Sequence, residues 1–83
     1  MLKVRVRVLY FARLRALLGV GEEVVELPEG ALVSTLLEAL KSRHEALRGA
    51  EGIMVAVNAE YASAERGLRE GDVVALLPPV SGG

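Results

Sequence analysis

The chain has 83 residues, which is enough for one domain with a single hydrophobic core. Apolar residues make up 52% of the sequence, so it is not an intrinsically disordered chain. Ten basic and eleven acidic residues give a net charge of −1, which disfavours bulk nucleic-acid binding. Cysteine is absent and His44 is the sole histidine, which excludes thiolate ligands, cysteine nucleophiles and multi-histidine metal sites. We therefore expect no bound metal or cofactor.

The sequence shows neither a secretion signal nor a membrane span. Its N-terminus alternates apolar and basic residues, whereas a signal peptide contains a continuous apolar segment. No apolar run approaches the roughly 20 residues that cross a bilayer. We expect a cytoplasmic protein that does not bind membranes.

Residues 2–9 follow a period of two, which predicts a strand. The even-numbered residues from Leu2 to Val8 are apolar and are expected on the core. The odd-numbered residues from Lys3 to Arg7 are basic and face the other way. The first 19 residues hold five bases and no acid, whereas the remainder holds five bases and eleven acids. The basic face is either a solvated surface or a docking face for an acidic partner, and the sequence leaves both open.

The next segment changes to a helical period. Apolar residues at i, i+3 and i+7 from Phe11 predict a short helix over residues 11–18, which Gly19 ends. Valine-rich residues 22–27 predict a second strand, and residues 28–30 predict a turn.

Residues 32–47 have the strongest helical pattern of the chain. One stripe of this helix is made of residues spaced three and four apart, namely Val33, Leu36, Leu37, Leu40, His44 and Leu47. Leu32 occupies the position where a capping Ser or Thr is expected, so Ser34 is the expected cap of a slightly later start. His44 is predicted to be a semi-buried residue near the helix end rather than a catalytic one, because the sequence implies no partner for it.

The second half of the chain predicts three further strands. Residues 53–57 carry no charge, as expected of a well-covered strand, and residues 58–60 form a hairpin turn before a short strand that begins at Tyr61. Leu68 is the expected buried anchor of a tight turn, and residues 72–77 form the last strand.

This order of elements predicts a two-layer α+β domain over residues 1–77. Its mixed sheet of four or five strands packs on one long helix, with a short helix beside it. The first and last strands are expected to be central and parallel, with the long helix crossing one face of the sheet.

Residues 78–83 are predicted to form an extended, flexible C-terminal tail. Pro78 and Pro79 cannot donate to a strand ladder, so the sheet stops there. Gly82 and Gly83 have no side chain and can thread a passage too narrow for any other residue. A frayed terminus is the alternative, although Pro-Pro directly after a strand does not favour it.

Several stretches of the chain resemble the ubiquitin-like sulfur carriers, and most of all the small subunit of molybdopterin synthase. They are Leu-Tyr-Phe-Ala-Arg-Leu-Arg at 9–15, Leu-Pro-Glu-Gly at 27–30, Val-Ala-Val-Asn at 55–58, Leu-Arg-Glu-Gly-Asp-Val-Val-Ala at 68–75 and Leu-Pro-Pro-Val-Ser-Gly-Gly at 77–83. The chain departs from this family at Leu32, where threonine is usual, and at Leu77, where an aromatic is frequent. The resemblance implies the ubiquitin-like β-grasp fold.

The resemblance also implies a chemical role for the tail. A ubiquitin-activating-type adenylyltransferase would use ATP to adenylate the carboxylate of Gly83, and sulfur from a sulfurtransferase or desulfurase would convert it to a thiocarboxylate. This group would donate sulfur to cyclic pyranopterin monophosphate in the large synthase subunit, within a heterotetramer. The chain would then be a sulfur-donating subunit rather than an enzyme on its own.

Two further sets of residues follow from the resemblance. The tail residues would thread into the active sites of the partners, namely Pro78, Pro79, Val80, Ser81 and Gly82. Phe11, Arg15, Tyr61 and Leu77 would contact the partners, since exposed aromatics and arginines make good interface anchors. For Phe11 and Leu77 plain core packing is the alternative, and for Arg15 a solvated helix face.

Three other functions remain open. The same tail chemistry would serve a sulfur carrier for thiamine or for tRNA thiolation, or a ubiquitin-like protein modifier. A passive β-grasp module that binds RNA is a third possibility. The net charge of −1 and the lack of an aromatic stripe on the basic face disfavour it.

Overall fold

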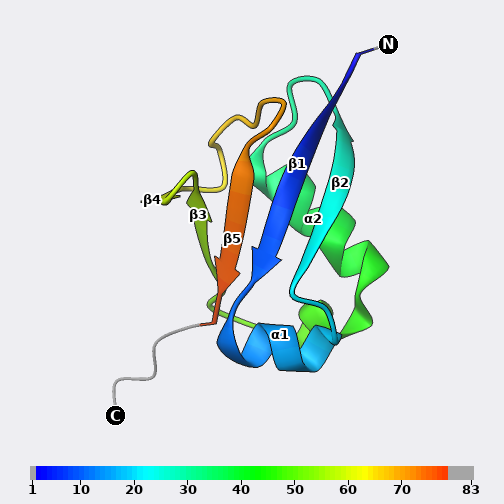
Figure 1. Ribbon diagram of the computed structural model, residues 1–83, viewed down its shortest axis with the longest axis vertical. Helices are drawn as coiled ribbons and strands as arrows, with labels where there is room; N and C mark the ends of the chain where they lie inside the picture. Colours follow the sequence, from blue (N-terminus) through cyan, green and yellow to red (C-terminus); the bar gives the residue numbers. More distant parts are fainter. Residues whose placement is uncertain (1, 79–83) are drawn as a thin grey trace.

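The computed structural model describes residues 2–78, and Met1 and residues 79–83 lie outside the described part (Figure 1). The elements in chain order are β1 (Lys3–Tyr10), α1 (Ala12–Leu18), β2 (Glu22–Pro28), α2 (Val33–Arg43), the 3₁₀ helix η1 (Glu45–Gly49), β3 (Met54–Val57), β4 (Glu60–Tyr61) and β5 (Val73–Leu77). They form a five-stranded mixed sheet in the order β2-β1-β5-β3-β4, in which β1 and β5 are parallel. The predicted α+β class and the central parallel pair are confirmed.

Strand β1 has its predicted alternation. Val4, Val6 and Val8 are buried against α2, and the residues between them are exposed or half-buried. Leu2 is 70% exposed, so its predicted place in the core is wrong. The reason is that pairing with β2 begins at Lys3, and Leu2 lies beyond the covered part of the sheet.

Helix α2 packs its buried side chains Val33, Leu36 and Leu40 onto one face of the sheet. The prediction that the helix continues to residue 47 is wrong, because α2 ends at Arg43 and His44 is extended. The chain then forms the tighter turns of η1, which still bury Leu47. The sequence pattern located the buried side chain correctly, although it did not locate the end of the helix.

The start of α2 is capped by backbone carbonyl groups from a distant loop. Leu32 is the N-cap residue, and the N–H groups of Val33 and Ser34 donate to the carbonyls of Arg66 (2.9 Å) and Ala64 (3.0 Å). The expectation that Ser34 caps a later start is therefore wrong. These carbonyls satisfy two of the N–H groups that a capping side chain would otherwise serve.

Strand β3 is covered on one face only. Val55 and Val57 are buried, whereas Met54 is 36% exposed, so the expectation of a well-covered strand holds for half of its residues. The predicted hairpin to β4 is confirmed, and its turn residues Asn58 and Ala59 have positive φ values of 49° and 71°. A left-handed pair of this kind matches the twist of a two-residue hairpin.

The loop before β5 is anchored by Leu68, which is 4% exposed, as predicted. No helix within residues 2–78 has the length and apolar character needed to cross a membrane. The same residues contain no cluster of three or more side chains able to hold a metal ion.

Candidate partner-docking site at the root of the tail

The tail begins where β5 ends. Leu77 is the last residue of β5, and Pro78 follows it directly and is half-buried. Of the predicted tail residues only Pro78 is described. Pro79, Val80, Ser81, Gly82 and Gly83 lie outside the described residues, so their predicted roles stay predictions.

Phe11 lies at the root of the tail. Strand β1 runs parallel to β5 up to the pair Tyr10–Leu76, and the N–H of Phe11 donates to the carbonyl of Leu76 at 3.2 Å. Phe11 and Leu77 are therefore the next residues of two adjacent strands. The side chain of Phe11 is 43% exposed, so it is not the core residue that the helical pattern indicated.

The face of the sheet opposite α2 carries apolar side chains from four strands. Strand register places Leu9, Ala75, Ala56 and Tyr61 in one row and Leu77 beside Met54 in the next. We call these six residues the open-face patch. Tyr61 is 72% exposed and Met54 is 36% exposed. A contiguous apolar surface of this kind typically marks an interaction site.

Arg15 lies at the α1 end of this face. It lines a shallow groove together with Leu9, Phe11 and Gly21. Its guanidinium packs on Gly21, where an added Cβ would stand 3.1 Å from Nε. Within residues 2–78 no carboxylate lies within ion-pair distance of Arg15. The structure thus brings Phe11, Arg15 and Leu77 to one end of the sheet, whereas Tyr61 lies on its far edge strand (Figure 1).

Two of the three basic residues of β1 have a glutamate partner nearby. Arg7 pairs with Glu22 at 2.7 Å, and the hydrogen bond from Arg7 lowers the pKa of the Glu22 carboxyl. Arg5 lies 3.6 Å from Glu70, whose Oε1 also accepts from the backbone N–H of Arg5. This pairing favours a solvated face over a basic docking surface for β1.

A polar cluster that the sequence patterns did not predict lies on the α2 side of the sheet. The hydroxyl of Tyr10 donates to Oε2 of Glu23, Nε2 of His44 lies 2.5 Å from the same oxygen, and Arg43 pairs with Oε1 at 2.7 Å. The rings of Tyr10 and His44 meet edge to face at 5.9 Å. The partner of His44, which the sequence did not imply, is therefore Glu23. This cluster ties the ends of β1 and α2 to the start of β2.

The electrostatics of this cluster are dominated by Glu23. Partial burial alone would raise the pKa of Glu23, but hydrogen bonds from Tyr10, Arg43 and His44 outweigh it and lower the pKa to about 2. Burial, together with the Glu23 carboxylate, raises the pKa of Tyr10. The sequence did contain a sign of this cluster. In a strand Glu23 lies on the same face as the buried Val25 and Leu27, and a charged side chain on a buried face requires hydrogen-bond or ionic partners.

A family model described as the ThiS family matches residues 8–83. The chain belongs to the ThiS family. The resemblance to ubiquitin-like sulfur carriers and the β-grasp fold are thereby confirmed.

Relatives of this ThiS-family chain agree in sequence and structure. It is 40% identical to the molybdopterin synthase sulfur carrier subunit of Chlamydomonas reinhardtii, over 95% of this chain and 99% of the relative. Subunit 1 of a molybdopterin converting factor from Pyrococcus furiosus has a TM-score of 0.86 and 48% identity, covering 93% of this chain and 99% of its own. Small archaeal modifier protein 1 of H. volcanii has a TM-score of 0.84 and 30% identity, with coverage of 93% and 99%.

The fold also occurs in a multi-subunit setting. A chain in the complex of subunits 1 and 2 of molybdopterin-converting factor from Helicobacter pylori has a TM-score of 0.68 and 24% identity, covering 96% of this chain and all of that one. At this identity the likeness is one of fold.

Proposed function

We propose that this ThiS-family chain is the sulfur carrier subunit of a molybdopterin synthase. The observation that carries the proposal is the family match through residue 83, which includes the Pro-Pro-Val-Ser-Gly-Gly tail. The name of the C. reinhardtii relative, which matches along nearly its whole length, supports it. The position of Pro78 beside an exposed apolar patch supports a tail that works inside a partner.

The carboxylate of Gly83 takes up sulfur in two stages. A carboxylate is a poor electrophile, so its oxygen first attacks the α-phosphorus of ATP, which forms an acyl adenylate and releases pyrophosphate. The terminal sulfur of a persulfide on the donor enzyme then attacks the acyl carbon, and AMP leaves. A second thiol of the donor cleaves the resulting acyl disulfide, which leaves a thiocarboxylate on Gly83 and a disulfide on the donor. An adenylyltransferase of the ubiquitin-activating type binds the ATP, and a sulfurtransferase or desulfurase supplies the sulfur. The chain itself needs no resident cofactor.

The acceptor is cyclic pyranopterin monophosphate, held by the large subunit of the synthase. Each transfer moves one sulfur from the thiocarboxylate to the pterin and leaves Gly83 free to be loaded again. Two transfers complete the dithiolene of molybdopterin. Because the sequence contains no cysteine, no side chain can hold sulfur as a persulfide, and the sulfur must travel on the C-terminus.

The open-face patch is the surface on which the partners dock. Tyr61 and Leu77 contribute apolar area from the patch itself, and Phe11 and Arg15 extend it at the α1 end. Five residues follow Pro78, and an extended chain of that length spans ~17 Å. The tail can therefore enter an active site while the domain stays on the surface of the partner, with Gly82 and Gly83 in the narrowest part.

The assembly implied is a cytoplasmic heterotetramer with two copies of this chain at opposite ends of a large-subunit dimer. Neither nucleic acid nor a membrane takes part. Capture of partners on the full-length chain tests the assignment. Recovery of a large synthase subunit supports it, and recovery of a thiazole synthase in its place moves the assignment to thiamine.

The direct test is the mass of the intact chain after incubation with ATP, an adenylyltransferase and a sulfur source. We expect the mass increase of one oxygen-to-sulfur exchange at the C-terminus. The matched control is the chain that lacks Gly83, which should not change in mass. The proposal is contradicted if this chain stays unmodified while the same adenylyltransferase and sulfur source load sulfur onto another carrier protein.

A protein modifier is the second candidate, because the chain is similar to a protein named small archaeal modifier protein 1. The acyl adenylate is then attacked by a lysine amine of a target protein, AMP leaves, and an isopeptide bond forms. Conjugates that retain the whole chain on target lysines would support this function, and sulfur carriage and conjugation can share one tail.

A further inference from the structure

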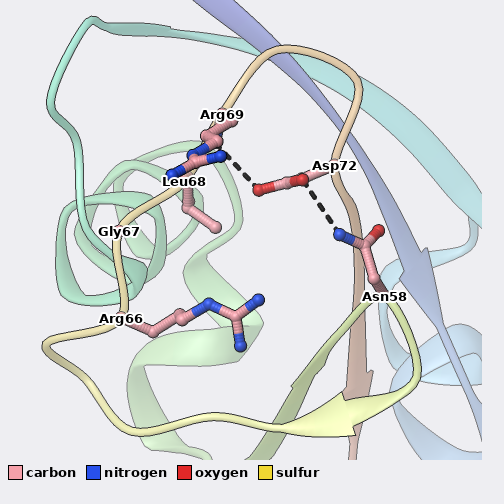
Figure 2. A pocket seen from close by; sticks show the side chains of 6 residues that line it. All are labelled: Asn58, Arg66, Gly67, Leu68, Arg69 and Asp72. Carbon is pink, nitrogen blue, oxygen red and sulfur yellow. Dashed lines mark hydrogen bonds between the residues drawn. The ribbon is translucent and has the colours of Figure 1, made fainter.

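A second hollow lies at the opposite end of β5 from the tail (Figure 2). It is lined by residues of the β3–β4 turn and of the loop before β5, namely Asn58, Arg66, Gly67, Leu68, Arg69 and Asp72. We call it the loop pocket. Asp72 precedes the first residue of β5 and Leu77 is the last, so the strand separates the loop pocket from the root of the tail (Figure 1).

The two arginines of the loop pocket are unpaired within residues 2–78. Three other arginines of the chain, Arg5, Arg7 and Arg43, each have a glutamate partner within 4 Å, but neither Arg66 nor Arg69 has one. Figure 2 shows the guanidinium of Arg66 extending from the loop into the space that faces Asn58. Arg66 is half-buried, so water screens its charge less than it would screen a fully exposed guanidinium.

The carboxylate in the loop pocket is already engaged. Oδ1 of Asp72 accepts from the side-chain amide of Asn58 at 3.0 Å, and Oδ2 accepts from the backbone N–H of Arg69 at 2.8 Å. Oδ1 of Asn58 in turn accepts from the N–H of Val73 at 3.0 Å. These bonds fix the loop in shape and leave the guanidinium groups as the free donors.

The start of α2 holds the backbone of Arg66 in place. The carbonyl of Arg66 accepts from the N–H of Val33 in the first turn of α2, and that turn contains no acidic residue. The helix therefore fixes the position of Arg66 without adding negative charge beside it. With two guanidinium groups against one carboxylate, the loop pocket has a net positive charge in a chain whose net charge is −1.

We propose that the loop pocket binds a phosphate group through Arg66 and Arg69. Guanidinium groups donate several parallel hydrogen bonds to phosphate oxygens, and a group with a charge of about −1.5 to −2 matches two arginines. The site is independent of the proposed sulfur chemistry, because it lies at the far end of β5 from Leu77 and shares no residue with the open-face patch.

The test is a titration of the full-length, isotopically labelled chain with inorganic phosphate at constant ionic strength, followed by amide chemical shifts. We expect saturable shifts confined to residues 58 and 66–73. The R66Q/R69Q double variant should weaken binding at least tenfold, since the loss of even one charge-assisted hydrogen bond is worth about that factor. The matched control is Arg13→Gln, which removes an exposed arginine from α1 and should leave phosphate binding unchanged.

A parallel titration with adenosine monophosphate and adenosine identifies the source of the phosphate. Equal affinity for phosphate and the nucleotide assigns the site to a phosphate group alone, and tighter binding of the nucleotide assigns it to a nucleotide. Both results support the site provided that adenosine does not bind. Shifts that do not saturate, that are as large at Arg13 as at Arg66, or that persist in the double variant overturn it. None of these results bears on whether Gly83 carries sulfur.

Discussion

Glu23 is expected to contribute more to stability than any other carboxylate that pairs with an arginine in the described residues. Its side chain is 19% exposed, and it holds Tyr10, Arg43 and His44 together. We therefore predict that Glu23→Gln, which keeps the shape and removes the charge, destabilises the domain. The loss arises because a neutral amide oxygen can accept from Arg43 but cannot replace the charge-assisted bond, which leaves that guanidinium without a charged partner.

The magnitude follows from the pKa of Glu23. A carboxyl group with a pKa of about 2 in the folded state, against 4.5 in the unfolded chain, contributes at most ~3 kcal/mol at neutral pH. Arg43 is 47% exposed, so water screens part of this interaction and we expect a loss of about 1–2 kcal/mol. For a domain of this size that loss lowers Tm by about 5–15 °C.

The assay is thermal and urea unfolding of the wild type and of two variants. Glu22→Gln is the matched control, because Glu22 neighbours Glu23 and pairs with Arg7 at the same 2.7 Å, but with both side chains more than half exposed. We expect no measurable loss from Glu22→Gln. Equal losses in the two variants would refute the argument that burial makes the difference.

The dependence on pH gives a second measurement of the same quantity. The folded pKa of Glu23 is lower than the unfolded one, so its contribution is complete above about pH 5 and is lost as the pH falls towards about 2. The difference in unfolding free energy between the wild type and Glu23→Gln should therefore shrink across this range. A difference that stays constant down to about pH 2 would show that Glu23 acts through shape and not through charge.

Four other changes have distinct expected outcomes. Deletion of Gly83 should leave Tm unchanged and abolish sulfur loading, as intact mass would show. Gly82→Val should block adenylation by steric hindrance, measured as pyrophosphate release, and normal kinetics would count against a narrow passage. Leu77→Asp should weaken partner binding at least tenfold by placing a charge in the open-face patch, whereas an unchanged Kd would remove Leu77 from the interface. Leu36→Ala should cost about 3 kcal/mol in urea unfolding, because Leu36 is a fully buried residue of α2, and a loss below 1 kcal/mol would contradict that packing.

The positions of the strands along the chain could be predicted because their signals are local. A period of two located β1 and the valine-rich β2, and the uncharged run at residues 53–57 located β3. The central parallel pair followed from the order of the elements. The end of α2 could not be predicted, because His44 leaves the helix towards Glu23, which lies 21 residues earlier in the chain. The cap of α2 is equally non-local, since its acceptors come from residues 64 and 66.

The candidate site likewise contains residues that could be predicted from the sequence and residues that could not. Tyr61 was expected to contact partners because the family resemblance and its aromatic side chain both indicated an interface anchor, and it is 72% exposed. Phe11 fitted a helical stripe equally well, and its exposure became evident only from its place before the first turn of α1. The loop pocket left no pattern in the sequence, because Asn58 and Asp72 are brought together by strand pairing across 14 residues.

The distribution of charge along the sheet constrains how a partner can dock. In the middle of the open face, Arg5 and Arg7 already form ion pairs with glutamates of the same chain. An acidic partner would therefore gain little binding energy from these two arginines. Arg15, held on Gly21 beside Phe11, has no such match within residues 2–78. A complementary carboxylate on the partner is therefore favoured at the α1 end, next to the point where the tail leaves the sheet. Docking there would orient the chain with Leu77 facing the partner, so that apolar contact supplies affinity and Arg15 fixes the direction in which Pro78 enters.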